Sequence, residues 1–284
     1  GVGSFRRPSS TLAAMVYRLI LSYRGGAYAG WQRQRNALAV QQVVEDAMTA
    51  WIDQPVTLAA AGRPDAGVHA HGQSAHLELT RDLPLRGLVH ATNQRLPEDI
   101  RILRADRMAE GFHARKCAQA KEYRYRLMIA EVVPAVEAPY VVGIRSAPDL
   151  EALESATAGL LGRHDFTAFA LSGGGHRSPV RTIFEAGWRL SGSALEFRVI
   201  GDGFLRGMVR SLVGTLLEVG QGSRSPADFL GLLAGRPRSE AGPTAPAHGL
   251  SLERVIYPES WRALVSHPPS GGSDESPGSG AVII

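Results

Sequence analysis

The sequence contains a single cysteine, Cys117, among its 284 residues. One cysteine cannot form a disulfide within the chain or supply a cysteine-based zinc site. No apolar run approaches the roughly 20 residues of a membrane-spanning helix, and arginines occupy the start of the chain, where a signal peptide would need an apolar core. We therefore expect a cytoplasmic globular protein that binds no metal and contacts no membrane.

Lysine is nearly absent, because Lys116 and Lys121 are the two lysines among 31 basic residues. Neither lies in a Walker A loop or in the lysine motif of protein kinases, which excludes ATP chemistry of those kinds. The formal net charge is +4, and six arginines precede the first acidic residue, Glu45. This asymmetry favours an anionic partner such as nucleic acid, while a solvated basic face is the alternative that charge alone leaves open.

Apolar periodicity predicts an N-terminal half over residues 15–135. Alternation of apolar and polar residues predicts strands at 15–23, 56–61, 74–80 and 123–129. Helical spacing predicts a helix over residues 40–51. Residues 62–72 are too rich in glycine, proline and histidine for regular structure and predict a loop. We expect the strands to share one mixed sheet.

A connector at 136–148 leads to a C-terminal half at 149–262. The pattern of this half predicts a helix at 149–161, a hairpin of strands 184–190 and 195–200, a helix at 205–217 and a shorter helix near 225–234. Residues 1–14 and 263–284 have the composition of disordered tails. Because a sheet with helices occurs twice, we predict an α+β fold of two similar halves.

The loop from Gly62 to Ala70 contains the most informative chemistry in the sequence. Small residues surround Arg63 and Asp65, so the backbone of this loop can approach a ligand while both charged side chains project from it. Pro64 restricts the geometry of the residue before it. The loop therefore suits a catalytic carboxylate, and an ordinary surface turn is the alternative.

Three further patterns have both a functional and a structural interpretation. His69, His71 and His76 suggest a metal site, but no carboxylate or cysteine completes a recognisable ligand set. The run 172–175 favours a flexible loop over a phosphate cradle, because it does not follow the dinucleotide-binding pattern. Residues 121–126 alternate basic and aromatic side chains, which suits either RNA bases and phosphates or a sheet with a tyrosine core. The same ambiguity applies to Arg33 and Arg35 beside Trp31; we predict that phosphate contacts are among Arg33, Arg35, Arg124 and Arg126.

Eight motifs in a fixed order resemble those of the tRNA pseudouridine synthase A family. The resemblance extends over about residues 15–258. The motifs are Gly30-Trp31-Gln32-Arg33-Gln34, the loop from Gly62 to His69, Phe112-His113-Ala114-Arg115, Tyr123-Arg124-Tyr125, His164-Asp165-Phe166-Thr167, Arg181-Thr182-Ile183, Phe204 with Met208-Val209-Arg210, and Ala245-Pro246-Ala247-His248-Gly249-Leu250.

This resemblance implies isomerisation of uridine to pseudouridine at positions 38, 39 and 40 of the tRNA anticodon stem-loop, without a metal or organic cofactor. The glycosidic bond at N1 breaks, the uracil rotates, and C5 bonds to C1′ of the same ribose. A carboxylate can serve as a nucleophile or as a base that removes the 2′ proton, and the sequence leaves both routes open.

The resemblance also implies roles for individual residues. Asp65 matches the catalytic aspartate, and Arg63 matches an arginine that holds the nucleotide after it has flipped out of its stack. Tyr123 matches the tyrosine that stacks on the target base. Arg210 matches an arginine that pairs with the catalytic carboxylate and favours its charged form. Leu250 matches an apolar residue of the base pocket.

The implied architecture is the pseudouridine synthase fold, in which sheets of two halves join around a central catalytic cleft with helices on the outer face and two copies form a homodimer. This sequence departs from the family pattern at Pro64, where a threonine is usual, and over residues 201–207, where polar and histidine residues are usual. Two alternatives stay open: a synthase for other RNAs, and an RNA-binding module without catalysis.

Overall fold

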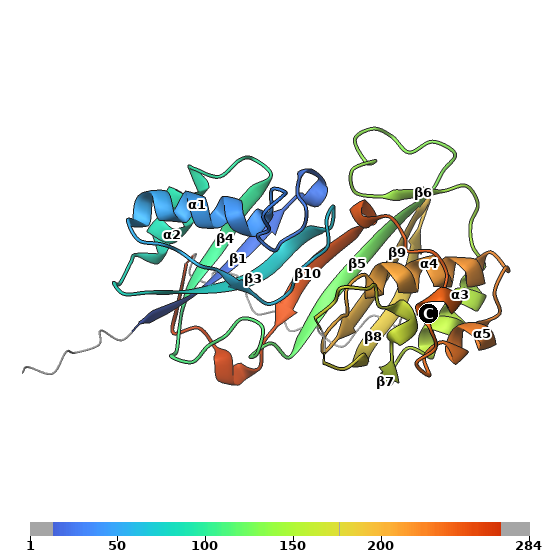
Figure 1. Cartoon of the computed structure of the whole chain (residues 1–284). Coiled ribbons are helices and arrows are strands. Elements are labelled where there is room, and N and C mark those ends of the chain that lie inside the picture. The colour runs from blue at the N-terminus through green and yellow to red at the C-terminus, as the bar shows by residue number, and fades with distance from the viewer. Residues whose placement is uncertain (1–13, 176, 268–284) are drawn as a thin grey trace, which may run out of the picture.

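A single mixed sheet of 11 strands extends through the computed structural model, which describes residues 14–175 and 177–267 (Figure 1). The strands are β1 (Met15–Tyr23), β2 (Ala59–Ala60), β3 (His69–Leu79), β4 (Ile100–Met108), β5 (Ala120–Ile129), β6 (Val142–Ile144), β7 (Gly162–Asp165), β8 (Val180–Ser191), β9 (Ala194–Gly201), β10 (Leu250–Ile256) and β11 (Val265–His267). The α-helices are α1 (Val40–Ile52), α2 (Leu85–Asn93), α3 (Leu150–Ala158), α4 (Met208–Gly220) and α5 (Pro226–Gly231).

The main path of the sheet is β11-β4-β1-β3-β10-β5-β9-β8-β7. β10 lies at its centre, although it belongs to the C-terminal half in sequence. It pairs in parallel with β3 and antiparallel with β5. The two halves are therefore joined through a shared strand, and the predicted α+β fold with two halves is confirmed.

Alternation along β1 explains how the N-terminal half is packed. Tyr17, Leu19 and Leu21 are buried in the main core together with Val44 and Met48 of α1. The predicted strand at 15–23 and helix at 40–51 are confirmed, because their apolar spacing matches the pleat and the helical turn. The opposite face of this half has a second, smaller apolar cluster.

Two boundaries in the N-terminal half differ from the prediction. Only Ala59–Ala60 of the expected strand at 56–61 pair with a neighbour. β3 begins at His69, so the end of the predicted loop at 62–72 is extended structure. Sequence patterns did not predict α2 and β4, because polar residues such as arginine and histidine interrupt their short apolar stripes.

The predicted hairpin of β8 and β9 and the helices α3, α4 and α5 are present in the C-terminal half, which also contains two strands that were not predicted, β7 and β10. Asp149 and Ser225 accept hydrogen bonds from backbone N–H groups in the first turns of α3 and α5. α4 begins later than residue 205, because Gly207 at its N-terminus has a φ of +67°. Leu205 and Arg206 consequently precede the helix.

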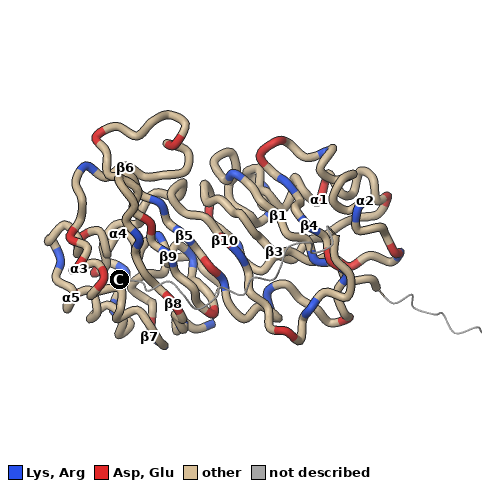
Figure 2. The backbone as a smooth tube through the Cα atoms, turned by 180° about the vertical axis from the view of Figure 1, so that it is seen from behind, with Lys and Arg blue, Asp and Glu red and all other residues tan. Residues whose placement is uncertain are grey.

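Figures 1 and 2 show that α1 and α2 lie over one half of the sheet and α3, α4 and α5 over the other half, all on the same face. Between the two groups of helices lie β10 and β5. No helix within residues 14–175 and 177–267 is long and apolar enough to span a membrane.

Two segments expected to lack structure contain short strands. β6 lies in the expected connector 136–148 and pairs in parallel with β5. β11 lies in the expected tail 263–284 and pairs with β4, which corrects the start of that tail. Three-residue strands have too few alternations to be recognised in a sequence. The rest of the expected tails, residues 1–13 and 268–284, lies outside the described residues.

The β11 pairing predicts a difference between two truncated proteins. Ending the chain at residue 262 removes the ladder with β4 and the hydrogen bond from Leu264 N–H to the Arg107 carbonyl (2.8 Å), whereas ending it at 267 keeps both. We expect the shorter protein to be less stable than the longer one by about 1–3 kcal/mol. Urea unfolding of both proteins measures this difference, and equal unfolding free energies would contradict it.

Candidate active site

A cavity of about 690 Å³ opens between the two halves, beside the first turn of α4. The N-terminal half contributes the loop at 62–66, and the C-terminal half contributes residues 173–175 and 204–209. Arg63, Asp65, Tyr123 and Leu250 all line this cleft. The structure therefore brings together four of the five predicted site residues, and the fifth, Arg210, contacts Asp65.

Backbone hydrogen bonds hold the Asp65 loop in place. The N–H of Trp31 donates to the Pro64 carbonyl (3.1 Å), and the N–H of Val68 donates to the Asp65 carbonyl (3.1 Å). Gly30 has a φ of +89°, and a Cβ atom there would lie 2.7 Å from the Pro64 oxygen. Glycine is therefore required where the two segments meet, and this close packing directs the Asp65 side chain into the cleft.

Asp65 forms an ion pair with Arg210, from the first turn of α4. Nη1 of Arg210 lies 3.4 Å from Oδ2 of Asp65, and both side chains are about one-fifth exposed, at 18% and 19%. Nε of Arg210 donates to the Ala245 carbonyl (2.8 Å), and the Ala245 N–H donates back to the Arg210 carbonyl (3.1 Å). Because its guanidinium is fixed at a second point, Arg210 can orient the carboxylate.

Arg206 is a second cation beside the same carboxylate, and no sequence motif indicated a role for it in the site. Its Nε lies 3.9 Å from Oδ1 of Asp65, and its Nη1 donates to the Ser172 carbonyl (2.8 Å). The glycine-rich run after Ser172 thus forms part of the cleft wall. The four-residue spacing between Arg206 and Arg210 was the available signal, although Arg206 lies before the helix.

Tyr123 is the aromatic wall of the cleft. Its side chain is buried, and its ring packs edge-on against Phe204 with centroids 5.0 Å apart. Burial, followed by the negative charge of Asp65, raises the pKa of the Tyr123 phenol. The phenol therefore stays neutral at physiological pH and offers an uncharged ring to a ligand.

Leu250 and Arg63 occupy different depths of the cleft. Leu250, the first residue of β10, is buried and adds an apolar surface. Arg63 is exposed, and within the described part of the chain no carboxylate forms an ion pair with it. An exposed guanidinium beside a partly buried carboxylate is suited to contact with an anionic ligand that enters the cleft.

Three of the four arginines predicted to include phosphate contacts already have carboxylate partners. Arg33 pairs with Glu45 (2.9 Å) and Asp46 (2.7 Å). Arg124 lies 3.3 Å from Glu196, on the opposite face of β5 from Tyr123, because adjacent strand residues point to opposite sides. Arg126 shares that face and is 3.7 Å from Glu196. Arg124 and Arg126 therefore do not line the cleft.

The chain is also similar to proteins of known family. Residues 156–258 match the family model described as tRNA pseudouridine synthase. tRNA pseudouridine synthase A of Syntrophotalea carbinolica is 43% identical over 242 residues, which cover 85% of this chain and 96% of the relative. The proteins of the same name from Methylobacterium nodulans and Myxococcus xanthus are each 40% identical, over 86% and 84% of this chain and 96% and 91% of their own lengths.

The chain belongs to the tRNA pseudouridine synthase A family. This confirms the resemblance drawn from the ordered motifs. Pro64, a departure from the usual pattern of the family, is buried and uses its carbonyl to hold the loop. The other departure, at residues 201–207, forms the turn between β9 and α4, and several of its residues line the cleft.

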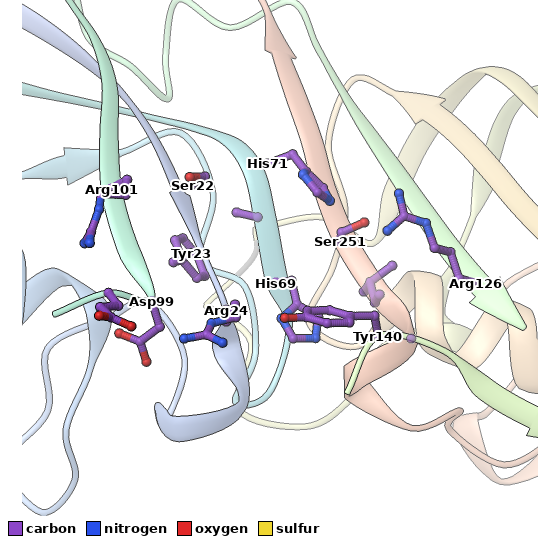
Figure 3. A pocket seen from close by; sticks show the side chains of 14 residues that line it. Ser22, Tyr23, Arg24, His69, His71, Asp99, Arg101, Arg126, Tyr140 and Ser251 are labelled. Atoms are coloured by element: carbon purple, nitrogen blue, oxygen red, sulfur yellow. The ribbon is translucent and has the colours of Figure 1, made fainter. Parts of the chain in front are cut away.

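This member of the synthase family has a second cavity of about 420 Å³. It lies where β1 ends and β3 begins, and His69 is one of its lining residues (Figure 3). The His69 ring accepts a hydrogen bond from Gly25 N–H at Nδ1 (3.0 Å) and lies 2.9 Å from the Pro139 carbonyl through Nε2. Tyr140 packs against the ring, with centroids 5.2 Å apart. No cluster of three or more potential metal-ligating side chains occurs within the described residues.

These contacts give His69 a role in stability that depends on pH. Burial lowers the pKa of His69 below its ordinary value of about 6.5, and protonation of Nδ1 would break the bond from Gly25. The unfolded chain therefore protonates His69 at a higher pH than the folded chain does. The stabilisation from neutral His69 is present above about pH 6.5 and is lost as the pH falls through the lower pKa of the folded state.

We therefore expect His69→Gln to reduce the loss of unfolding free energy between pH 7.5 and pH 5. Urea unfolding at both pH values measures this loss, and exposed His71→Gln is the matched control. A His69→Gln protein with the pH dependence of the parent would show that this histidine does not contribute.

Proposed function

We propose that this chain isomerises uridine to pseudouridine at positions 38, 39 and 40 of the tRNA anticodon stem-loop, with Asp65 as the catalytic carboxylate. Membership of the family makes the chain an isomerase that acts on tRNA. The proposal adds the tRNA positions and the roles of individual residues. The observation that carries it is the pairing of Asp65 with Arg210 inside a cleft with an aromatic wall.

The reaction needs a uridine outside its base stack, because a stacked base hides the glycosidic bond. Unstacking costs a few kcal/mol, which contacts in the cleft must offset. In the proposed complex, the uracil ring lies against Tyr123 and Leu250, and Arg63 holds the flipped-out nucleotide from the exposed side. The ribose then faces Asp65.

Asp65 then acts on this bound nucleotide by one of two routes. As a nucleophile it forms a covalent bond to the substrate, and as a base it removes the 2′ proton. In both routes the N1 bond to C1′ breaks, C5 bonds to C1′, the hydrogen on C5 leaves as a proton and N1 gains a proton. In the nucleophilic route the bond between Asp65 and the substrate also breaks before the product leaves. Arg210 supports either route, because it orients the carboxylate from a fixed point on α4.

The proposal also includes a cytoplasmic homodimer, as the family resemblance implies. Sedimentation equilibrium at several protein concentrations tests this part separately. A monomer at all concentrations would overturn the dimer and leave the proposed chemistry untouched.

The sharpest test of the proposed chemistry replaces the carboxylate. Asp65→Asn keeps the size of the side chain and removes its charge, so turnover should fall by about 10³-fold or more. Affinity for tRNA should stay close to that of the parent, because phosphate contacts supply most of it. Release of tritium from C5-labelled tRNA under single-turnover conditions, beside filter binding at fixed salt, measures both quantities.

Further variants connect the loss of turnover to the ion pair. Arg210→Ala should also reduce turnover strongly, and adding it to Asp65→Asn should cost little more, because residues that act as a unit are not additive. Asp46→Asn, which alters an exposed carboxylate outside the cleft, is the control. Turnover by Asp65→Asn near that of the parent would overturn the mechanism. A parent protein that binds tRNA without tritium release would favour the RNA-binding module.

Pro64 provides a second test, because a proline in place of the usual threonine beside Asp65 is the feature that favours an RNA-binding module without catalysis. The loop uses the carbonyl of residue 64, which threonine also has. We expect Pro64→Thr to keep the turnover of the parent, whereas Gly30→Ala should reduce it by displacing that carbonyl. The same tritium assay measures both variants. A large gain in turnover with Pro64→Thr would show that proline impairs the chemistry.

A further inference from the structure

Three cations line the wall of the cleft beyond Tyr123: Arg115, Lys121 and Arg181. Lys121 precedes Tyr123 by two residues on β5, so both side chains leave the same face of the sheet, about 6.6 Å apart along the strand. That separation is on the scale of one nucleotide. Arg115 and Lys121 are close in sequence, and the fold brings Arg181, from the start of β8, to the same wall.

These cations have no salt-bridge partner among the carboxylates of residues 14–175 and 177–267. Arg181 donates to two backbone carbonyls, of Ser178 (2.8 Å) and Val180 (2.6 Å). Asp202 is the one carboxylate whose charge acts on both Lys121 and Arg181. Its Oδ1 accepts a hydrogen bond from the Thr182 N–H (3.1 Å), which fixes it beside the wall.

The turn after β9 leaves this part of the wall open. Gly201 is the register partner of Lys121 on β9. A Cβ atom at Gly203 would lie 3.4 Å from Nε of Arg181. Both positions lie in the segment that departs from the family pattern. A side chain at residue 203 would therefore contact Arg181, whereas a Cβ atom at Gly201 would lie 3.0 Å from the Thr182 oxygen, so that glycine is required by packing.

The electrostatics of the wall favour an anion. Burial, and then the positive charges of Arg115 and Arg181, lower the pKa of Lys121 to about 8. Burial is also the leading cause that lowers the pKa of Arg181. Like charges in a partly buried wall repel one another. An anion bound between them would attract each cation and so offset this repulsion.

We propose that Arg115, Lys121 and Arg181 form a binding site for an RNA backbone phosphate next to the flipped-out uridine. The identity of the anion rests on the proposed function, since a nucleotide whose base lies against Tyr123 places a neighbouring phosphate along β5. A phosphate offers several acceptor oxygens, which suit the donors of two guanidinium groups and one ammonium group. The site would position the substrate backbone while Asp65 acts on the ribose.

The scarcity of lysine makes a direct test possible on the unmodified protein. An amine-reactive acetylating reagent at pH 8 should modify Lys121 readily, because a large fraction of this amine is neutral at that pH. Saturating tRNA should reduce modification of Lys121 several-fold, measured by peptide mass spectrometry. Lys116, the other lysine, is exposed and does not line the cleft, so it serves as the internal reference.

Variants test the phosphate contact itself. Lys121→Gln and Arg181→Gln should each flatten the slope of log affinity for tRNA against log salt by about 0.7–0.9. Lys121→Arg should retain the slope of the parent, because it keeps the charge. Lys116→Gln, the matched control, should leave binding and turnover unchanged.

The outcomes separate this site from the proposed function. Equal modification of Lys121 with and without bound tRNA, or parental salt slopes for both glutamine variants, would overturn the phosphate site even if the parent isomerises uridine. Protection by inorganic phosphate at the same concentration as tRNA would assign the site to a free anion and overturn the RNA assignment. Protection by tRNA without tritium release would support the site and count against the proposed chemistry.

Discussion

The insertion of β10 between β3 and β5 is the constraint on which the site depends. β3 follows the Asp65 loop, β5 contains Tyr123, and β10 begins at Leu250, so the pairing of these strands sets the spacing between the three residues. The segment before β10 also holds α4 in position, because Ala245 exchanges two hydrogen bonds with Arg210. One strand therefore sets both the wall of the cleft and the partner of the catalytic carboxylate.

The two faces of β5 have different arrangements of charge. On the helical side, Lys121 and Tyr123 border the cleft. On the other side, Glu122 forms 2.7 Å ion pairs with Arg198 and Arg254. Because Glu122 is buried, these ion pairs offset the cost of burying its charge, and they occupy the arginines involved. Lys121, the cation of β5 that has no such partner among the described residues, is on the cleft side, where an anionic substrate is expected.

Local sequence patterns predicted most elements because their physical causes are local. Alternation along 15–23 and helical spacing along 40–51 follow from the pleat and the helical turn, and both elements formed as expected. Boundaries were less predictable. A glycine with positive φ at 207 starts α4 late, and β11 has three residues, too few to show alternation. The ordered motifs identified the family, which no single motif could do.

The sequence by itself determined the class of fold, the family and four of the residues that line the cleft, because periodicity and motif order are properties of the chain. Tertiary structure alone decided which charges meet. In the folded chain Arg206 lies beside Asp65, and Lys121 lines the cleft together with Arg115 and Arg181. Arg124 and Arg126 lie on the face of β5 that is opposite to the cleft. The physical reason is that charge interactions depend on distances of a few ångströms, and pairing between distant strands sets those distances.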